Sequence, residues 1–139
     1  MSARKAAVDT SVIIRLLTGD DERKRRAAEK LFKDAAAGSL TLHLPPVTIL
    51  ETVWVLEKSY GVPRATVADI VEALLNSPGV RVERAPAWRA ALRDYSSRNV
   101  KFADAALAHW ALDEGLNAVY TFDEKDFRRI EGIVPLIPH

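Results

Sequence analysis

One stretch near the N-terminus constrains the fold more than any other. Residues 5–14, KAAVDTSVII, form an apolar run with a single acid, Asp9, in its middle. A run so dense in Ala, Val and Ile predicts a strand buried on both faces, as in a parallel sheet covered by helices. Asp9 would then lie at the carboxyl end of the strand, where open α/β sheets place their sites. A buried carboxylate is costly unless it is paired, hydrogen-bonded or metal-bound. In the alternative interpretation, Asp9 and Ser11 only cap the helix that starts near Val12.

Length and composition narrow the class of protein. The 139-residue chain is expected to form one domain over residues 1–139. It has no cysteine, which excludes disulfides, thiolate catalysis, cysteine-based zinc sites and iron–sulfur clusters. A formal net charge of +1 gives the whole protein no strong field for nucleic acid, so such binding would depend on local patches. The sequence shows neither a signal-peptide pattern nor a membrane span, so we expect a soluble, cytoplasmic protein with no membrane contact.

Hydrophobic periodicity predicts strands that alternate with helices along the chain. Helices are predicted over residues 11–17, 20–35, 47–60, 63–76, 86–98 and 102–112. Strands are predicted in the first apolar run and over residues 40–44, 80–83, 117–122 and 133–137. This alternation predicts an α/β fold with a central parallel sheet of about five strands, the third of them short, and helices on both faces.

Two further acids lie on predicted helices. Glu51 lies at helical spacing from Val47 and Trp54, so we expect its carboxylate at the border of the apolar face. The alternative is a residue at the edge of that stripe that reaches water. Asp104 lies near the start of its helix and is predicted to point with the small apolar face. The amides of the first turn and the helix dipole should help to keep it ionised, whereas an ordinary first-turn acid would face solvent.

A fourth acid follows the strand predicted over residues 117–122. Asp123 comes directly after this strand, and Asp126 comes three residues later. The alternative interpretation makes Asp123 the N-cap and Asp126 the N3 residue of a short helix, a variant of the capping box. Capping and function are compatible, so both interpretations stay open. The three histidines, His43, His109 and His139, show no pattern of a histidine-centred site.

Together the acids predict a metal site. Asp9, Asp104 and Asp123 are expected to converge at one edge of the sheet, with Glu51 as a fourth member. Four ionised carboxylates need a counter-charge, because like charges raise one another's pKa. Ligation by oxygen alone selects hard cations, so we expect Mg²⁺ or Mn²⁺, with Ca²⁺ as an inert substitute. One or two such ions can activate water and stabilise in-line displacement at phosphorus. An aspartyl-phosphate enzyme would need a second acid two residues after Asp9, where this sequence has Ser11. The sequence also has no glycine-rich loop of the kind that binds phosphate, so both of these phosphate chemistries fit poorly.

Four segments, in this order, resemble the PIN-domain ribonucleases, specifically the VapC toxins of type II toxin–antitoxin pairs. They are residues 8–21, 49–56, 102–105 and 121–127. The resemblance implies a PIN-like α/β fold and a Mg²⁺- or Mn²⁺-dependent endoribonuclease that cleaves tRNA or rRNA. It also implies a homodimer and a cognate antitoxin. The antitoxin would place an arginine among the carboxylates, where it competes with the metal as a bidentate cation.

The resemblance also assigns roles to individual residues. Catalysis and metal binding fall to Asp9, Glu51, Asp104 and Asp123, with Asp126 as a further candidate. Hydroxyl groups that orient these acids would come from Thr10, Ser11 and Thr121. Basic residues near the motifs that could steer phosphates are Arg15, Arg98, Lys101 and Lys125.

Two other functions are compatible with the sequence. The near-neutral charge also fits a non-catalytic module whose acidic pocket binds a basic peptide, because phosphate contacts usually dominate affinity for nucleic acid. A nuclease that acts on DNA, or a housekeeping PIN enzyme of RNA processing, is a closer alternative. The RNA target is not readable from the sequence, because structured RNA is recognised largely by shape and loop context.

Overall fold

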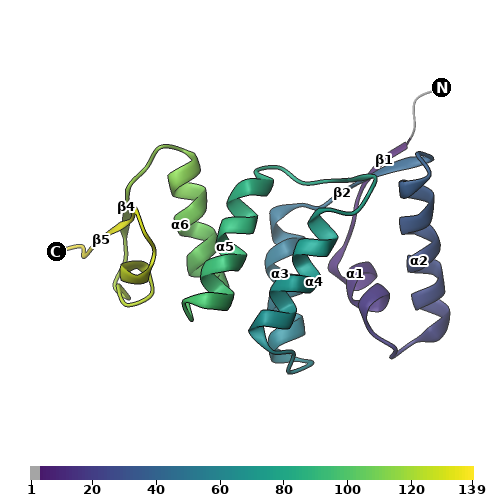
Figure 1. Ribbon diagram of the computed structural model, residues 1–139, viewed down its shortest axis with the longest axis horizontal. Coiled ribbons are helices and arrows are strands. Elements are labelled where there is room, and N and C mark those ends of the chain that lie inside the picture. The colour runs from purple at the N-terminus through teal and green to yellow at the C-terminus, as the bar shows by residue number, and fades with distance from the viewer. Residues whose placement is uncertain (1–3) are drawn as a thin grey trace. The chain divides into compact units, whose positions relative to one another are not determined.

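The computed structural model describes residues 4–139, which form two compact units (Figure 1). The first unit comprises the chain up to Pro63 together with Asp69–Glu83. The second comprises Arg64–Ala68 together with Arg84–His139. Helix α4 (Arg64–Leu75) contributes residues to both. The expectation of a single domain over residues 1–139 stays a prediction.

The first unit is built on a parallel sheet of three strands in the order β1-β2-β3. These strands are β1 (Arg4–Ala7), β2 (Leu40–His43) and β3 (Val80–Arg81). In their register Ala6 lies opposite Leu42, and Leu42 lies opposite Val80. Leu42 is almost fully buried, because β2 is the central strand.

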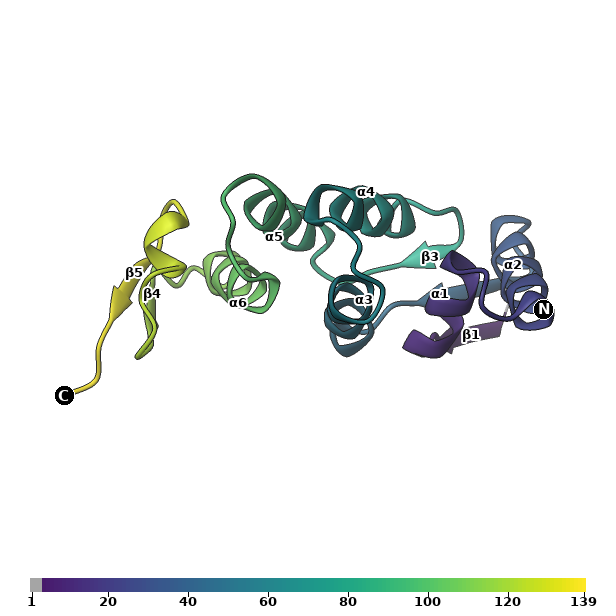
Figure 2. The same cartoon turned by 90° about the horizontal axis from the view of Figure 1, so that it is seen from below.

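Three helices belong wholly to the first unit: α1 (Thr10–Leu17), α2 (Glu22–Ala36) and α3 (Pro46–Lys58). Helix α1 packs on both α2 and α3 (Figure 2). Asp21 caps α2, since its side chain accepts a hydrogen bond from the Lys24 amide at 3.1 Å. Pro45 and Pro46 begin α3, where a missing amide proton costs nothing. The helices predicted from periodicity are therefore confirmed to within a few residues.

The second unit contains α5 (Ala85–Ser97), α6 (Phe102–Asp113), the 3-10 turn η1 (Phe127–Arg129) and two strands. The strands β4 (Ala118–Tyr120) and β5 (Val134–Leu136) form a two-stranded parallel sheet. Helices α5 and α6 pack on each other. Phe102 joins them, because its ring lies 6.0 Å from that of Trp88 and 5.6 Å from that of the buried Tyr95.

The predicted α/β class is confirmed, but the sheet is smaller than predicted. Five parallel strands are present in residues 4–139, arranged as sheets of three and of two rather than as one sheet of five. The strands have two to four residues each. Periodicity finds such strands, but it does not determine which of them pair.

The prediction that the first strand is buried on both faces is wrong. Arg4, Lys5 and Ala7 are exposed, and Ala6 is half-buried. Burial begins only at Val8, after the strand has ended, and Asp9 itself is exposed. Burial therefore does not require Asp9 to be paired or metal-bound, contrary to the prediction.

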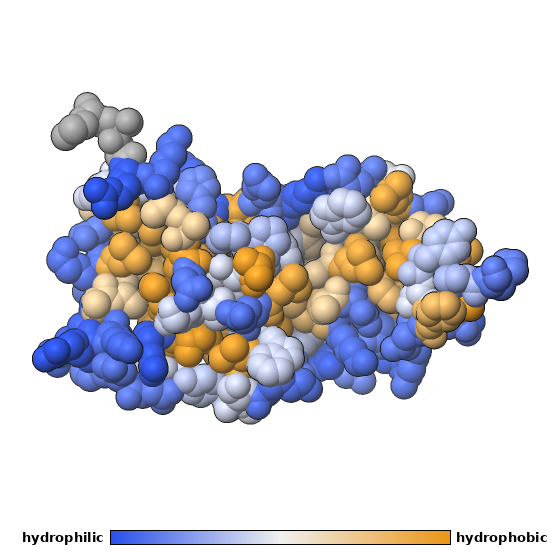
Figure 3. Space-filling view, turned by 180° about the vertical axis from the view of Figure 1, so that it is seen from behind, coloured by the Kyte–Doolittle hydropathy of each residue, from blue (hydrophilic) through white to orange (hydrophobic). Residues whose placement is uncertain are grey.

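The described part of the chain has no helix with both the length and the apolar character needed to cross a membrane. Hydrophobic side chains nonetheless reach the surface of both units (Figure 3).

Candidate active site

Asp9 links β1 to α1 as the N-cap of that helix. Its Oδ2 atom accepts hydrogen bonds from the Ser11 amide at 3.0 Å and from the Ser11 hydroxyl at 2.5 Å. Asp9 therefore caps α1, as the capping interpretation predicted. This capping is compatible with metal binding, because a carboxylate has about four lone-pair positions and the two bonds use only one oxygen.

The same hydrogen bonds determine the charge of Asp9. The Ser11 hydroxyl, and after it the Ser11 amide, lower the pKa of Asp9 below its ordinary value. Asp9 is therefore ionised at neutral pH without help from a cation. Thr10, whose backbone also lowers the pKa of Asp9, is buried. The predicted orienting role of a neighbouring hydroxyl fits Ser11 rather than Thr10.

Glu51 lies on the exposed side of α3, not at the border of its buried face. The buried face of α3 is formed by Thr48, Ile49, Thr52, Val53 and Leu56. Val47 and Trp54, which share the side of Glu51, are themselves largely exposed. The prediction that Val47 and Trp54 mark the buried face of this helix is therefore wrong. The buried face includes two threonines, which a search for apolar residues does not count.

Thr48 ties the helix of Glu51 to the chain next to Asp9. Its hydroxyl donates a buried hydrogen bond to the carbonyl of Val8 at 2.8 Å, and the Thr52 hydroxyl donates to the carbonyl of Thr48 at 2.7 Å. Thr48 lies one turn before Glu51, and Val8 immediately precedes Asp9. Thr48 is not among the residues predicted from the sequence. Its only signal is a threonine at helical spacing from Glu51, which is too common to be informative.

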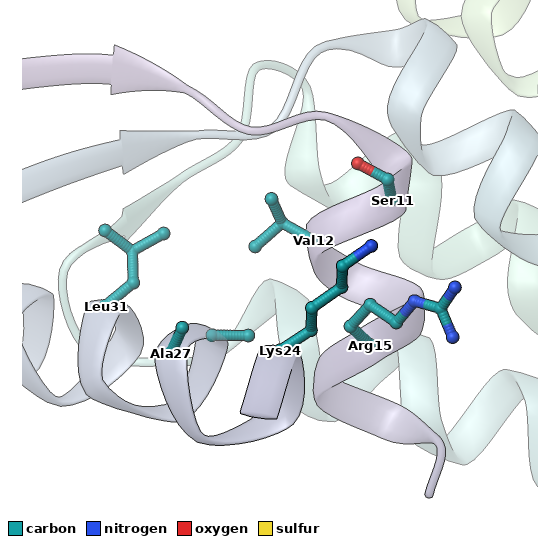
Figure 4. A pocket seen from close by; sticks show the side chains of 7 residues that line it. Ser11, Val12, Arg15, Lys24, Ala27 and Leu31 are labelled. Atoms are coloured by element: carbon teal, nitrogen blue, oxygen red, sulfur yellow. The ribbon is translucent and has the colours of Figure 1, made fainter. Parts of the chain in front are cut away.

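A pocket of about 470 Å³ lies between α1 and α2. Its lining comprises Ser11, Val12, Arg15, Lys24, Ala27, Ala28 and Leu31. Figure 4 shows Leu31 at one end, with Lys24 and Arg15 at the other. Ser11 lines this pocket and also donates a hydrogen bond to Asp9. The two cations of the pocket, Arg15 and Lys24, belong to the same unit as Asp9. Arg15 was among the basic residues predicted near the motifs.

Asp104 and Asp126 come together in the second unit. Asp104 lies in the first turn of α6 and is half-buried, with Ala108 and Ala111 buried on the same side of the helix. Asp126, in the loop before η1, is buried, and its Oδ2 atom accepts a hydrogen bond from the Lys101 amide at 2.9 Å. This bond holds Asp126 at the N-terminus of α6, where the helix dipole favours an anion.

The pKa of Asp104 is raised above its ordinary value. Burial is the largest cause, followed by the hydrogen bond and the negative charge of Asp126; the charge of Asp123 adds to the rise, and Lys101 opposes it. The predicted help from the first-turn amides and the helix dipole does not bring the pKa of Asp104 below its ordinary value, because burial and two acidic neighbours raise it. A cation bound beside Asp104 would oppose these causes and favour its ionised form.

Asp123 is exposed in the loop after β4. Its amide donates to the Thr121 hydroxyl at 2.9 Å, and that hydroxyl donates to the Asp123 carbonyl at 3.2 Å. Thr121 thus fixes the backbone at Asp123 rather than its carboxylate, unlike the predicted role. The capping-box alternative is wrong, because only the 3-10 turn η1 follows, and Asp126, at its N-cap, makes no capping bond from its side chain.

Asp126→Ala should destabilise the protein by about 1–2 kcal/mol, because the Lys101 amide loses a charged acceptor. Asp126→Asn keeps an acceptor oxygen and removes a negative charge from beside Asp104, so its stability should equal or exceed that of the wild type. Urea unfolding of the metal-free proteins measures both. Equal destabilisation by the two substitutions would mean that the hydrogen bond to Lys101 is not what Asp126 contributes.

The acids fall into two sets. Asp9 and Glu51 belong to the first unit, and Asp104, Asp123 and Asp126 belong to the second. No three acidic or histidine side chains within residues 4–139 lie close enough together to hold a metal ion. The donors in both sets are carboxylate oxygens, the ligands that Mg²⁺ and Mn²⁺ prefer.

His109 pairs with Asp94 at 2.5 Å between α5 and α6, in keeping with a structural role.

Comparison with known proteins identifies the family. The model of the PIN domain matches residues 6–133. The chain is 30% identical over 118 residues to a VapC ribonuclease of Aquifex aeolicus (strain VF5), with 85% of this chain and 87% of the relative covered. It also resembles a chain in the crystal structure of VapBC2 from Rickettsia felis bound to a DNA fragment from their promoter. That likeness has 14% identity, covers 97% of this chain and 99% of the other, and gives a TM-score of 0.38, which is too low to support an inference. On the family model and the Aquifex relative, the chain belongs to the PIN-domain family and, within it, to the VapC ribonucleases.

Proposed function

We propose that this protein is a metal-dependent endoribonuclease, the toxin of a type II toxin–antitoxin pair. Its similarity to a VapC ribonuclease over 85% of the chain carries the proposal. The metal is Mg²⁺ or Mn²⁺, and its ligands are drawn from Asp9, Glu51, Asp104 and Asp123. The substrate is a tRNA or an rRNA in the cytoplasm, and the partners are a cognate antitoxin and a second copy of the chain.

The charges of the described acids support a cation as cofactor. Ser11 lowers the pKa of Asp9, whereas burial and Asp126 raise the pKa of Asp104. A divalent cation, when bound, offsets the repulsion between carboxylates, lowers the pKa of a bound water and polarises the phosphate. Fixed negative charge without a cation would repel the RNA backbone, so the acids alone are a poor phosphate site.

Each acid has a defined part in this proposal. Asp9, rigidly held at the start of α1, presents one carboxylate in a fixed orientation. Glu51 projects from a helix whose position is fixed through Thr48. Asp104 supplies a half-buried carboxylate whose pKa a cation would lower, and Asp123 completes the set from a loop fixed by Thr121.

The test is cleavage of purified tRNA and of total RNA by antitoxin-free protein, with Mg²⁺, Mn²⁺ or EDTA. Discrete products should form with either metal and not with EDTA. Glu51→Gln should lower the rate by about 10-fold or more, because a metal or water ligand is lost. Glu57→Gln, on the same helix but away from Glu51, is the matched control and should cleave like the wild type.

The outcomes separate the alternatives. Equal cleavage by wild type and Glu51→Gln would indicate a contaminating nuclease or a wrong assignment of Glu51. Cleavage of DNA in place of RNA would indicate a DNA-directed PIN enzyme. Salt-sensitive binding of a basic peptide in EDTA, with no turnover in either metal, would favour the binding module.

A further inference from the structure

Two arginines of the second unit join the segment that precedes α6 to the turn η1. Residues 98–101 connect α5 to α6. Nη1 of Arg129 donates a hydrogen bond to the Asn99 carbonyl at 3.2 Å. In the opposite direction, Nη1 of Arg98 donates to the Arg129 carbonyl at 3.1 Å. We call this reciprocal pair of hydrogen bonds the arginine clamp.

The arginine clamp lies beside the contact between Asp126 and the start of α6. Asp126 immediately precedes η1, and its Oδ2 atom lies 2.9 Å from the amide nitrogen of Lys101, the N-cap residue of α6. Together with the clamp, this bond joins residues 98–101 to residues 126–129 at three points. Asp104 lies about one turn further along α6.

The backbone of residues 98–101 depends on side chains from elsewhere in the chain. Asn99 has a φ angle of 56°, in the left-handed region, and such a conformation persists where surrounding contacts fix it. Its carbonyl is bound by Arg129, and the next carbonyl, that of the buried Val100, accepts a hydrogen bond from Nη1 of Arg64 at 2.9 Å. The direction in which α6 starts is therefore fixed by tertiary contacts.

The contacts of Arg98 favour a positioning role over the steering of phosphates expected from the sequence. Its guanidinium donates to the Arg129 carbonyl, and its Nε atom lies 3.5 Å from Oδ1 of Asp94. Both partners belong to the protein itself. Lys101 is the cation whose charge lowers the pKa of Asp104. The clamp arginines therefore affect Asp104 through the position of its helix.

We propose that Arg98 and Arg129 are positioning residues for the metal-binding carboxylates of the second unit. The inference rests on the proposed function, in which Asp104 and Asp123 are metal ligands. Asp104 lies on the helix at one end of the clamp, and Asp123 lies three residues before Asp126 at the other. A binding site needs its ligands held to within about 0.5 Å, and the clamp fixes the two segments that carry them.

Calorimetric titration with Mn²⁺ tests the proposal through the sign of the effect. Arg129→Met removes a positive charge, which through charge alone would strengthen the binding of a cation. Loss of the clamp should instead weaken Mn²⁺ binding by about 10-fold, the lower end of what loss of a supporting group costs. Arg129→Lys keeps the charge and a donor and should recover most of the loss.

Arg128→Met is the matched control. Arg128 is the neighbour of Arg129 in η1, but it pairs with Glu124 at 2.7 Å. Its removal deletes the same charge and leaves the clamp intact, so Mn²⁺ should bind at least as tightly as to the wild type. Arg98→Met should weaken binding as Arg129→Met does. The double variant should lose less than the product of the two effects, because both arginines join the same two segments.

Hydrogen exchange of the metal-free protein gives a readout that needs no metal. The amide proton of Lys101, which Asp126 accepts, should exchange several-fold faster in Arg129→Met and at the wild-type rate in Arg128→Met. A purely structural role of Arg129 would lower Tm and speed exchange throughout the second unit, but Mn²⁺ would bind the folded variant as tightly as the wild type.

The two proposals fail in different ways. If the wild type binds Mn²⁺ and cleaves RNA, and Arg98→Met and Arg129→Met bind Mn²⁺ equally well or more tightly, only the positioning role is wrong. If the wild type itself binds no Mn²⁺ and cleaves no RNA, the proposed function fails, and the clamp has no metal ligands to position.

Discussion

Asp104→Asn should lower kcat/KM for RNA cleavage by more than about 100-fold. Removing a group that only supports a metal ligand costs about 10- to 100-fold, and Asp104 is proposed to touch the metal itself. Asn is isosteric and neutral, so the first turn of α6 should be preserved. Mn²⁺ binding, measured by titration calorimetry, should weaken in parallel. Asp69→Asn, which changes an exposed acid on α4, is the control and should leave both quantities unchanged.

The same substitution should stabilise the metal-free protein at neutral pH. The folded protein binds the proton of Asp104 more tightly than the unfolded chain does, because the pKa of Asp104 is raised. Wild-type stability therefore falls as the pH rises from the ordinary Asp pKa through the raised value. Asp104→Asn removes this loss. Solvent screening limits the gain to about 1 kcal/mol, or a few degrees in Tm at neutral pH.

The difference in Tm between Asp104→Asn and wild type should vanish in acid, where Asp104 is protonated in both states. Saturating Mn²⁺ should reverse the order, since only the wild type gains from binding. Unchanged Mn²⁺ affinity in Asp104→Asn would remove Asp104 from the metal site. A lower Tm of the metal-free variant would show that the charge of Asp104 does not destabilise the fold.

The helices were predictable from the sequence because their signals are local. Asp21 before Glu22, the proline pair before α3 and the periodic apolar residues each act within a few positions of the chain. Sheet pairing is not local in this sense. The spacing of residues 40–44 predicts a strand, but nothing in it shows that β2 lies between β1 and β3.

The sequence context singles out the four candidate acids, but it predicts the wrong environment for some of them. Asp9, Glu51, Asp104 and Asp123 stood out because each interrupts an apolar pattern or follows a strand. Whether such an acid is buried depends on contacts that come from elsewhere in the chain.

Asp126 shows this limit most clearly. It is the one buried carboxylate in residues 4–139, and it influences Asp104 more than Asp123 does. Its position depends on the loop that brings it to the Lys101 amide, 25 residues away in the chain. The spacing between Asp123 and Asp126 indicated a helix cap instead, which the 3-10 turn η1 does not use.

Asp9 offers the sharpest separation of a structural role from a functional one. As N-cap of α1 it can be replaced by Asn, which caps helices about as well, so Asp9→Asn should keep the wild-type Tm to within about a degree. As a metal ligand it depends on its charge, so the same variant should lose more than about 100-fold in kcat/KM and bind Mn²⁺ weakly. Asp9→Ala should lose both the activity and a few degrees of Tm.

Ser11→Ala completes the series for Asp9. It removes the hydroxyl that lowers the pKa of Asp9 most. The carboxylate of Asp9 stays in place, and so does the hydrogen bond that the Ser11 amide donates to it. Activity should fall by about 10-fold or more, as for loss of a group that orients a metal ligand, and high Mn²⁺ concentration should restore it. Asp9→Asn should not be restored by metal, because its charge is gone. If Asp9→Asn cleaves RNA at the wild-type rate while Asp9→Ala melts early, Asp9 is only a helix cap, and the metal must be held by other acids.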